Sequence, residues 1–509
     1  MSVAGPLPGW LDPLYEADEM RSVDAWAIQE QGVPSLDLME RAGLGLARLT
    51  AAAARPGPVR ILVGKGNNGG DGLVAARLLR AEGRDIEVVA VGELEELSGD
   101  PLANLERLPG AAPVPWHPDC LAGSGAVVDA LLGTGVTGEP REPYASAIAA
   151  LNGQDAPVVA CDVPFGVDAT SGQVAGAAVR ADATATFHGS KVGLHVLPGA
   201  LCAGVVEVVE IGVPRGAPEP TAAGLISDRV LELYPHRTRQ GSKFTSGTVV
   251  VVGGGRGLTG APAMAALAAQ RAGAGYVQAA VPASAELALS LRLLEAMTRA
   301  LPESPDGMHV PDGVNEAMEM AERAGAVVLG PGLGRTDGAR RFALDLAQRV
   351  QAPLLVDADG LNAHAGALES LQGRAAPTVL TPHSGELGRL LERDSKEIDA
   401  ARLESARQAA ERSGAVVVLK GDDTIVAAPG GPVAISPGAT PALATAGTGD
   451  VLSGVIGALL AKGLGAFEAA ALGVLAHVRA GQAAAERHGA DHTVAGDVIE
   501  ALPDGLRTG

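Results

Sequence analysis

The sequence has few aromatic and few sulfur-containing side chains. Only 2% of its 509 residues are Phe, Trp or Tyr, and its three cysteines, Cys120, Cys161 and Cys202, are widely spaced and form no C-x-x-C pair. So few rings argue against the stacking platforms on which proteins bind single-stranded nucleic acid. The cysteine spacing indicates neither a disulfide framework nor a thiolate zinc site, so we expect a reducing, cytoplasmic compartment.

Positive charge is also scarce. The chain has 39 lysines and arginines against 59 aspartates and glutamates, which gives a formal net charge of -20 at pH 7. An acidic surface repels nucleic-acid backbones and anionic lipids, so we expect neither as a partner. Any phosphate-bearing ligand should be bound by local loop donors.

Targeting and membrane segments are not expected either. The first ten residues lack a basic stretch followed by an apolar run, which argues against a standard signal peptide. The longest apolar region, from Val451 to Ala485, is interrupted by Lys462, His477 and Arg479. This region therefore predicts buried helices and no membrane span.

The length of the chain predicts two α/β domains, because 509 residues are too many for one ordinary core. Residues 212–220 are rich in proline and glycine and are the best candidate for a linker. We therefore expect one domain over residues 1–215 and a second over residues 225–509.

Short β-branched runs alternate with helical stretches in the first half. The strand at Val59–Val63 leads into the glycine-rich residues 64–72 and then into a helix from Leu73, the strand, glycine loop and helix of Rossmann-like folds. Further strands are predicted at Ile86–Val91, Ala126–Ala130, Val158–Cys161, Ala183–Phe187 and Val205–Ile211. This alternation predicts a doubly wound parallel sheet.

The second half of the sequence also begins with a predicted strand that is followed by a glycine-rich loop. The strand that begins at Thr248 is followed by a glycine loop and by an alanine-rich helix from Pro262 to Ala272. Further strands are predicted at Ala326–Leu329, Pro353–Asp357, Thr378–Thr381, Val416–Leu419 and Ile425–Ala427. A second α/β domain follows from this pattern.

A glycine loop near the C-terminus has the features of a phosphate site. Gly447, Gly449 and Gly454 let the backbone approach an anion, and the apolar run from Val451 supplies a helix whose first amides would face it. Asp450 lies in the first turn, where an aspartate is also a common cap. Beside a phosphate, however, a carboxylate is unfavourable unless it takes a proton from a reacting hydroxyl or helps to hold a metal.

The segment Ala-Thr-Ala-Gly-Thr-Gly-Asp-Val-Leu-Ser-Gly at residues 444–454 resembles the anion-hole segment of the ribokinase-like superfamily. From about Arg237 onward the chain resembles the ADP- or ATP-dependent NAD(P)H-hydrate dehydratases, and the first 215 residues or so resemble the NAD(P)H-hydrate epimerases. Together the halves resemble the bifunctional repair enzymes. The resemblance implies epimerisation of the R and S forms of hydrated NADH or NADPH, and dehydration of the S form with ADP or ATP, K⁺ and Mg²⁺.

The epimerase resemblance assigns residues in two loops and one cation site. The segment from Gly66 to Gly72 matches the family signature residue for residue, although Leu73 stands where the family often has an aromatic ring. The implied contacts to the hydrated dinucleotide are Asn67, Asn68, Gly69, Gly70 and Asp71, with Gly133, Thr134, Gly135, Val136, Thr137, Gly138 and Glu139 around its phosphates. Asn68 and Asp129 would be oxygen ligands of one potassium ion.

Asp162 is the expected acid/base of epimerisation and a substrate contact. It ends the strand Val158–Cys161, and a carboxyl there could protonate the C6 hydroxyl of the hydrate and admit water on either face. A strand-end aspartate is also a common helix cap. The motif reads Asp-Val-Pro-Phe-Gly, so Phe165 replaces the family's potassium-binding serine, and main-chain oxygens must complete the cation site or leave it weaker. Lys191 is either a second candidate or a solvated lysine.

The dehydratase resemblance also assigns substrate and nucleotide contacts. Leu258 stands where the family often has an aromatic ring, and Asp357 and Asn362 are expected to line the site. The implied substrate contacts are Ala261, Gly332, His383 and Asp450, and the implied nucleotide contacts are Lys420, Gly421, Asp422, Asp423, Thr424 and Gly449. Asp450 would be the base of phosphoryl transfer.

Two other functions fit parts of the pattern. The Ala-Gly-Thr-Gly-Asp loop is shared by kinases of small alcohols, and the N-terminal half could be a non-catalytic dinucleotide-binding module. The Thr-Pro-His-Ser-Gly-Glu segment at residues 381–386 resembles the Thr-Pro-His-Pro-Gly-Glu element of the dehydratases, which argues against the first. The presence of Asn68, Asp129 and Asp162 argues against the second. We expect small-molecule substrates and a homo-oligomer, whereas the choice between ADP and ATP is left open.

Overall fold

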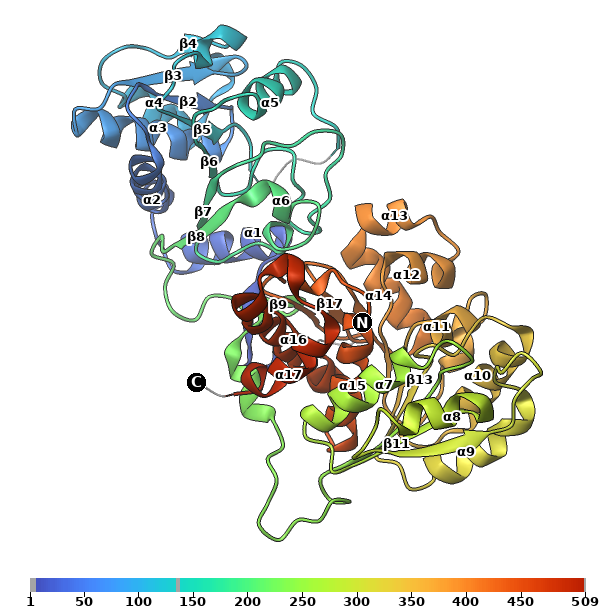
Figure 1. The fold of residues 1–509 in the computed structure, drawn as a ribbon. Coiled ribbons are helices and arrows are strands. Elements are labelled where there is room, and N and C mark those ends of the chain that lie inside the picture. The colour runs from blue at the N-terminus through green and yellow to red at the C-terminus, as the bar shows by residue number, and fades with distance from the viewer. Residues whose placement is uncertain (1–5, 134–137, 508–509) are drawn as a thin grey trace. The chain divides into compact units, whose positions relative to one another are not determined.

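The computed structural model describes residues 6–133 and 138–507, and the chain divides into two compact units (Figure 1). The N-terminal unit is Pro13–Ala223, and the C-terminal unit combines Met1–Asp12 with Gly224–Gly509. The first segment therefore groups with the C-terminal unit, whereas the sequence analysis placed it in a domain of residues 1–215. Trp10 gives the reason, because its ring is only 7% exposed and lies 5.5 Å from that of Phe467.

Trp10→Ala should lower the free energy of unfolding of the C-terminal unit by about 3–5 kcal/mol, because it removes a buried ring from that core. Denaturant titration of the full chain measures this, with a fragment of residues 13–223 used to assign the transition of the other unit. Trp116→Ala, in the N-terminal unit, is the matched control and should leave the C-terminal transition in place. Equal midpoints for Trp10→Ala and the wild type would contradict the placement of this segment.

The N-terminal unit is built on one sheet of seven strands in the order β4-β3-β2-β5-β6-β7-β8. Every neighbouring pair in it is parallel. The strands are β2 (Val59–Val63), β3 (Ile86–Ala90), β4 (Val114–Pro115), β5 (Ala126–Ala130), β6 (Val158–Cys161), β7 (Ala183–Phe187) and β8 (Val205–Val209). The strand order reverses between β2 and β5, and open α/β sheets bind ligands at the carboxyl ends of such a pair.

Helices cover both faces of this sheet. They are α1 (Ala17–Ala25), the π-helix η1 (Trp26–Glu30), α2 (Ser35–Ala53), α3 (Asn67–Ala81), α4 (Gly99–Glu106), α5 (Tyr144–Asn152) and α6 (Ala200–Ala203), with short 3-10 turns η2 (Leu94–Glu96), η3 (Pro118–Leu121) and η4 (Val192–Leu194). Residues of α2 and α3 share one core cluster with alternate strand residues, and α5 packs in a second cluster. The predicted doubly wound sheet is confirmed.

The predicted start of α3 at Leu73 is wrong, since the helix begins at Asn67. The glycines of this run form the first turns of the helix because they allow close packing. A Cβ on Gly69 would lie 2.0 Å from the carbonyl oxygen of Gly64, and one on Gly72 would lie 2.7 Å from Ala130 Cβ. The run therefore brings the N-terminus of α3 against the ends of β2 and β5.

The C-terminal unit contains a sheet of eleven strands in the order β1-β9-β18-β17-β16-β15-β14-β13-β10-β11-β12. The strands are β1 (Leu11–Leu14), β9 (Ala223–Ile226), β10 (Thr248–Val252), β11 (Tyr276–Pro282), β12 (Met297–Leu301), β13 (Ala326–Leu329), β14 (Leu354–Val356), β15 (Thr378–Leu380), β16 (Val416–Leu419), β17 (Ile425–Ala427) and β18 (Val433–Ile435). The pairs from β12 to β16 are parallel, and β17 and β18 are antiparallel.

One face of this sheet is covered by α7, α15, α16 and α17, which contact one another and share a core cluster with alternate strand residues. The helices are α7 (Gly260–Arg271), α8 (Ala283–Ser290), α9 (Val314–Ala321), α10 (Asp337–Arg349), α11 (Asp359–Ala363), α12 (Ser384–Leu391), α13 (Ser395–Ala400), α14 (Arg402–Ser413), α15 (Thr448–Ala461), α16 (Ala466–His488) and α17 (Ala495–Gly505), with 3-10 turns η5 (Asp228–Leu233), η6 (Pro311–Gly313), η7 (Leu368–Leu371), η8 (Pro441–Leu443) and η9 (Ala490–His492). Among the helices in the described ranges, none is both long and apolar enough to cross a membrane.

Candidate active sites

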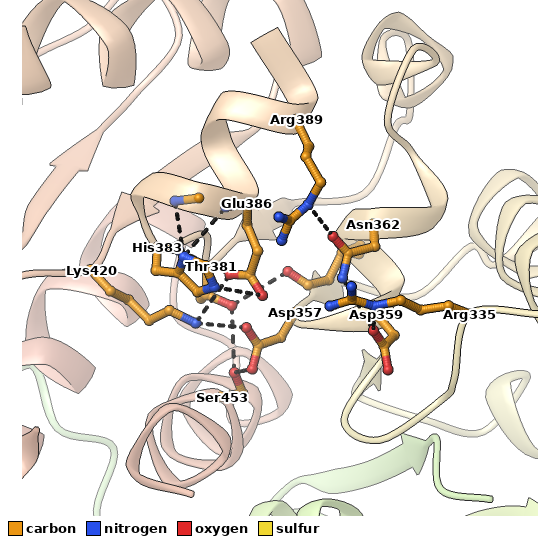
Figure 2. A network of polar contacts seen from close by, with 12 residues as sticks. Arg335, Asp357, Asp359, Asn362, Thr381, His383, Glu386, Arg389, Lys420 and Ser453 are labelled. Carbon is orange, nitrogen blue, oxygen red and sulfur yellow. Dashed lines mark hydrogen bonds and ion pairs between the residues drawn. The ribbon is translucent and has the colours of Figure 1, made fainter. Parts of the chain in front are cut away.

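The parallel neighbours β13, β14, β15 and β16 of the C-terminal unit end at the same edge of the sheet. Polar side chains follow the last three of these strands. Asp357 follows β14, the Thr381–His383 turn follows β15, and Lys420 follows β16. The N-terminus of α15 brings Asp450 and Ser453 to the same edge. Figure 2 shows these side chains, apart from Asp450, pointing toward one another.

Asp357 is the centre of this network and is almost fully buried. Its Oδ1 accepts a hydrogen bond of 2.9 Å from Lys420 Nζ, and its Oδ2 accepts one of 2.8 Å from Ser453 Oγ. The carboxylate of Glu386 lies 3.7 Å from the same ammonium. Burial opposes the charge on Lys420, but Asp357 and Glu386 outweigh it and raise the pKa of the ammonium. Lys420 is therefore a fixed positive charge at the sheet edge.

Asp450 has the properties of a base that works near neutral pH. Burial, reinforced by the nearby Asp357 carboxylate and opposed by Lys420, raises the pKa of Asp450 to about 7. A carboxylate with a pKa near the working pH is both available and basic enough to take a proton. Its neighbour Gly449 lies against Lys420, because a Cβ there would be 3.4 Å from the ammonium.

A cavity of about 350 Å³ opens beside Lys420. Its polar side includes Lys420, Gly421, Asp422, Thr424 and Gly449, and its apolar side includes Leu443, Leu452, Val474 and Val478. Loop amides and an ammonium suit phosphates, and an apolar wall suits a purine ring. Five of the six residues expected to bind nucleotide thus line one cavity.

The sixth, Asp423, points elsewhere. Its carboxylate is buried and forms an ion pair of 2.8 Å with Arg402 Nε, on helix α14. Thr424 Oγ1 also makes an internal contact, donating a hydrogen bond of 2.7 Å to the carbonyl of Gly421. These two side chains therefore fix the loop that carries Lys420.

His383 caps helix α12. Its Nδ1 accepts hydrogen bonds from the amides of Gly385 and Glu386 at 3.0 and 3.3 Å. An accepting Nδ1 leaves the proton on Nε2, which lies 3.5 Å from Glu386 Oε1. Burial, opposed by Glu386, lowers the pKa of His383, which favours this neutral form.

Ala261 and Gly332 lie side by side, at the start of α7 and after β13. A Cβ on Gly332 would be 3.4 Å from Ala261 Cβ and 2.7 Å from the carbonyl oxygen of Leu258. The φ of +65° at Gly332 also requires glycine. The Leu258 side chain is exposed on this side of the sheet edge.

The N-terminal unit has a cavity of about 210 Å³ that is lined by Asn67, Asn68, Asp71, Asp162 and Lys191, among others. Lys191 is 1% exposed, so the alternative of a solvated lysine is wrong. Its ammonium donates to Asp162 Oδ1 at 2.5 Å and to Thr186 Oγ1 and the Phe187 carbonyl at 3.0 Å each. This ion pair fixes the Asp162 carboxylate inside the cavity.

Two features mark the surroundings of Asp162 as chemically unusual. Its backbone has a φ of +64°, which is rare for a residue other than glycine and is typical of strained functional positions. Burial, reinforced by the Asp162 charge, raises the pKa of Asp71 well above its usual range. An Asp71 carboxyl with a raised pKa beside the buried Asp162 carboxyl suits acid and base roles in one cavity.

The two residues expected to bind potassium are buried, and their side chains form hydrogen bonds with the backbone. Asn68 Nδ2 donates to the Cys161 carbonyl at 2.7 Å, and Asp129 Oδ2 accepts from the Phe165 amide at 2.8 Å. Burial raises the pKa of Asp129 to about 6, although the amides of Phe165 and Leu131 oppose the shift. Within the described ranges, no three His, Cys, Asp or Glu side chains gather as a metal site.

The phosphate loop expected at residues 133–139 is described only in part. Thr134, Gly135, Val136 and Thr137 lie outside the described residues. Gly133 packs against Asn68, because a Cβ there would be 2.4 Å from Asn68 Oδ1, and Glu139 packs against Gly176. The first contact joins the end of β5 to the start of α3.

Comparison with known proteins supplies the family. A model of the NAD(P)H-hydrate dehydratases matches residues 249–504, and a model of the YjeF-related protein N-terminus matches residues 35–193. The bifunctional NAD(P)H-hydrate repair enzyme Nnr of Salinibacter ruber is 42% identical to the chain, over 96% of this chain and 95% of that protein. The chain belongs to the family of bifunctional NAD(P)H-hydrate repair enzymes. This confirms the family that the sequence motifs indicated.

A second relative in this family covers the chain to a similar extent. The repair enzyme of Moorella thermoacetica is 39% identical over 97% of this chain and 96% of that protein. Among solved structures, an ADP/ATP-dependent NAD(P)H-hydrate dehydratase from Bacillus subtilis, co-crystallised with ATP and Mg²⁺, is 27% identical. It covers 56% of this chain and 97% of its own, with a TM-score of 0.49.

Ser453 and Glu386 are site residues that the sequence analysis missed. Ser453 lies three residues after Asp450 on the same helix, and this i, i+3 spacing places both on one face. Glu386 closes a capping box with His383, a local signal that explains its backbone contact but not its contact with Lys420. The helical spacing could have found Ser453.

Proposed function

We propose that this chain repairs hydrated NADH and NADPH. The C-terminal unit dehydrates the S form at the expense of ADP or ATP, and the N-terminal unit interconverts the R and S forms. The observation that supports the proposal most is the placement of Asp450, with a pKa of about 7, beside a fixed ammonium and a cavity of about 350 Å³.

In the proposed dehydration, Lys420 and the amides of the loop at residues 446–449 hold the transferring phosphoryl group. Asp450 takes the proton from the C6 hydroxyl while the oxygen of that hydroxyl attacks the terminal phosphorus of ADP or ATP. The rest of the nucleotide leaves. The lone pair of the ring nitrogen then expels the phosphate, and loss of a proton from C5 of the resulting iminium restores the dihydronicotinamide. A magnesium ion bound with the nucleotide would neutralise charge on the phosphates, and the Asp357 and Glu386 carboxylates offer oxygen ligands for it.

In the proposed epimerisation, the hydrate lies in the cavity next to Asp71 and Asp162. A protonated carboxyl donates to the C6 hydroxyl, water leaves, and water returns to either face while the other carboxylate accepts its proton. The neighbouring ammonium of Lys191 keeps Asp162 in place. Asn67 and Asn68 at the start of α3 also line this cavity.

Incubation with hydrated NADH and each nucleotide tests the proposal. Recovery of the reduced-nicotinamide absorbance is expected with S-hydrate, and ADP and ATP are compared in parallel. A stable phosphorylated product without this recovery would support the small-alcohol kinase instead. Consumption of R-hydrate should require the N-terminal cavity.

We further propose that one potassium ion binds Asn68 and Asp129, and that main-chain oxygens complete its ligands. The Phe165 side chain cannot act as a ligand, because it has no oxygen, and its buried ring lies 5.4 Å from that of Tyr144. The R-hydrate rate should rise with potassium concentration in the wild type and lose this dependence in Asp129→Asn. Phe165→Ser should mainly destabilise the unit, by about 3–5 kcal/mol, through loss of a buried ring. Identical potassium curves for the wild type and Asp129→Asn would rule out this site.

A cytoplasmic homo-oligomer is also proposed. Cys120, Cys161 and Cys202 are all free thiols, which suits a reducing compartment. Leu287, Leu291 and Leu294 are 68%, 73% and 85% exposed around the end of α8, and such apolar groups favour association with a second copy. Light scattering of the purified chain measures the state directly.

A further inference from the structure

A second pocket lies beyond Asp357 in the C-terminal unit, on the side of α11. Its volume is about 220 Å³, and three arginines line it together with Asp359 and Asn362. Arg335 follows β13, Arg340 is on α10 and Arg389 is on α12. Three arginines in one small pocket stand out in a chain with a formal net charge of -20.

Each arginine is held through its Nε atom. Arg335 Nε donates to Asp359 Oδ1 at 2.9 Å, Arg340 Nε to the Ala363 carbonyl at 3.2 Å, and Arg389 Nε to Asn362 Oδ1 at 2.7 Å. Within the described part of the chain, no residue accepts a hydrogen bond from their terminal nitrogens. Figure 2 shows Arg335 and Arg389 fixed in this way over Asp359 and Asn362.

Asp359 does not neutralise the pocket. Its two oxygens already accept from Arg335, Asn362 and the Gly334 amide, at 2.9, 3.1 and 3.0 Å. Three guanidinium groups therefore face one carboxylate, so the pocket has a surplus of positive charge. The terminal N–H groups of guanidinium suit phosphate oxygens in geometry and charge.

Figure 2 shows Lys420, which lines the cavity of about 350 Å³ proposed for the nucleotide, and Arg335, which lines this pocket, on opposite sides of Asp357. The two cavities share no lining residue. Asp359 is close enough to Asp450 for its charge to contribute to the raised pKa of that base, after burial and the larger effects of Asp357 and Glu386. A hydrate with its ring at Asp450 must extend its phosphates away from the bound nucleotide.

We propose that Arg335, Arg340 and Arg389 bind a phosphate group of the hydrated dinucleotide. This subsite rests on the proposed dehydratase function. The phosphate is either the diphosphate bridge, which both hydrates have, or the 2′-phosphate, which only hydrated NADPH has. In the second case the pocket would set the preference between the two substrates.

The test compares Arg335→Gln, Arg340→Gln and Arg389→Gln with Arg341→Gln. Arg341 is exposed on the same helix as Arg340 but does not line the pocket, so it controls for the loss of one charge. The KM for S-hydrate should rise by roughly tenfold or more in the three pocket variants, since each loses a charge-assisted hydrogen bond. The KM for ADP should stay at the wild-type value in all of these variants. In Arg341→Gln the KM for S-hydrate should also stay at the wild-type value.

The two phosphate sources give different results. A rise in KM for both hydrates identifies the diphosphate, and a rise for hydrated NADPH alone identifies the 2′-phosphate. An unchanged KM for both hydrates in all three variants, or an equal rise in Arg341→Gln, would overturn the subsite.

A second measurement separates the subsite from the proposed function. Thermal protection by inorganic pyrophosphate, with the nucleotide cavity saturated by ADP, should be present in the wild type and reduced in the pocket variants. If the wild type shows this protection but does not dehydrate S-hydrate, the proposed function fails and the anion subsite stands. If it dehydrates S-hydrate while pyrophosphate protects all variants equally, the subsite fails.

Discussion

Asp450→Asn should slow nucleotide-dependent dehydration of S-hydrate by roughly 10²–10⁴-fold, which is the usual contribution of a positioned base. The amide has nearly the same shape as the carboxylate but cannot take the proton of the C6 hydroxyl. Nucleotide affinity should change little, because Lys420 and the loop at residues 421–424 still line the cavity. Absorbance recovery gives the rate, and calorimetry gives the affinity for ADP.

The pH dependence of this variant gives an independent check. Since the base must be deprotonated, kcat/KM of the wild type should rise with pH up to about 7 and then level off, whereas the residual rate of Asp450→Asn should lack this step. The pKa of Asp450 in the folded state lies above the ordinary value of an aspartate, so the wild type loses stability as pH rises from about 4 through about 7. The variant should therefore be more stable than the wild type at pH 8.

The control is Asp345→Asn on α10, which makes the same chemical change at a half-exposed position that pairs with Arg349. It should keep both the wild-type rate and the wild-type pH profile. Near-normal turnover by Asp450→Asn would contradict the assignment of the base.

The sequence is informative where local patterns determine structure. The strand runs, the linker region and the glycine loops place Asp162, Lys420 and Asp450 at strand or helix ends, as the structure has them. These features depend on residues that are neighbours in the chain. The α/β class of both halves could therefore be predicted from periodicity and glycine placement.

Long-range pairing could not be predicted in this way. Lys420 and Asp357 are 63 positions apart, and no local pattern specifies their ion pair. Asp422 and Asp423 are adjacent, yet Asp422 lines the cavity beside Lys420 and Asp423 pairs with Arg402 in the interior. The first residues of the chain contain one short strand without a clear period, so the burial of Trp10 against Phe467 becomes visible only in three dimensions.

The two members of the buried ion pair in the N-terminal unit, Asp162 and Lys191, should have different effects when each is replaced. Asp162→Asn should reduce epimerisation by roughly 10²–10⁴-fold, since it removes the acid/base group. Lys191→Met should destabilise the unit by about 3–5 kcal/mol, because it leaves the Asp162 carboxylate buried without its partner. The rate of R-hydrate consumption measures the first effect, and denaturant titration measures the second.

The double variant Asp162→Asn/Lys191→Met separates a structural role from a catalytic one. It removes both charges together, so much of the stability lost in Lys191→Met should return, because an uncompensated buried charge costs more than a neutral pair. Epimerisation should nevertheless stay absent, since the acid/base group is missing. Consumption of S-hydrate by the same protein is the internal control, because Asp450 and the nucleotide cavity are intact. Consumption of R-hydrate by the double variant at the wild-type rate would mean that the ion pair only stabilises the fold. The acid/base group of epimerisation would then be another side chain of the cavity, with Asp71 as the first candidate.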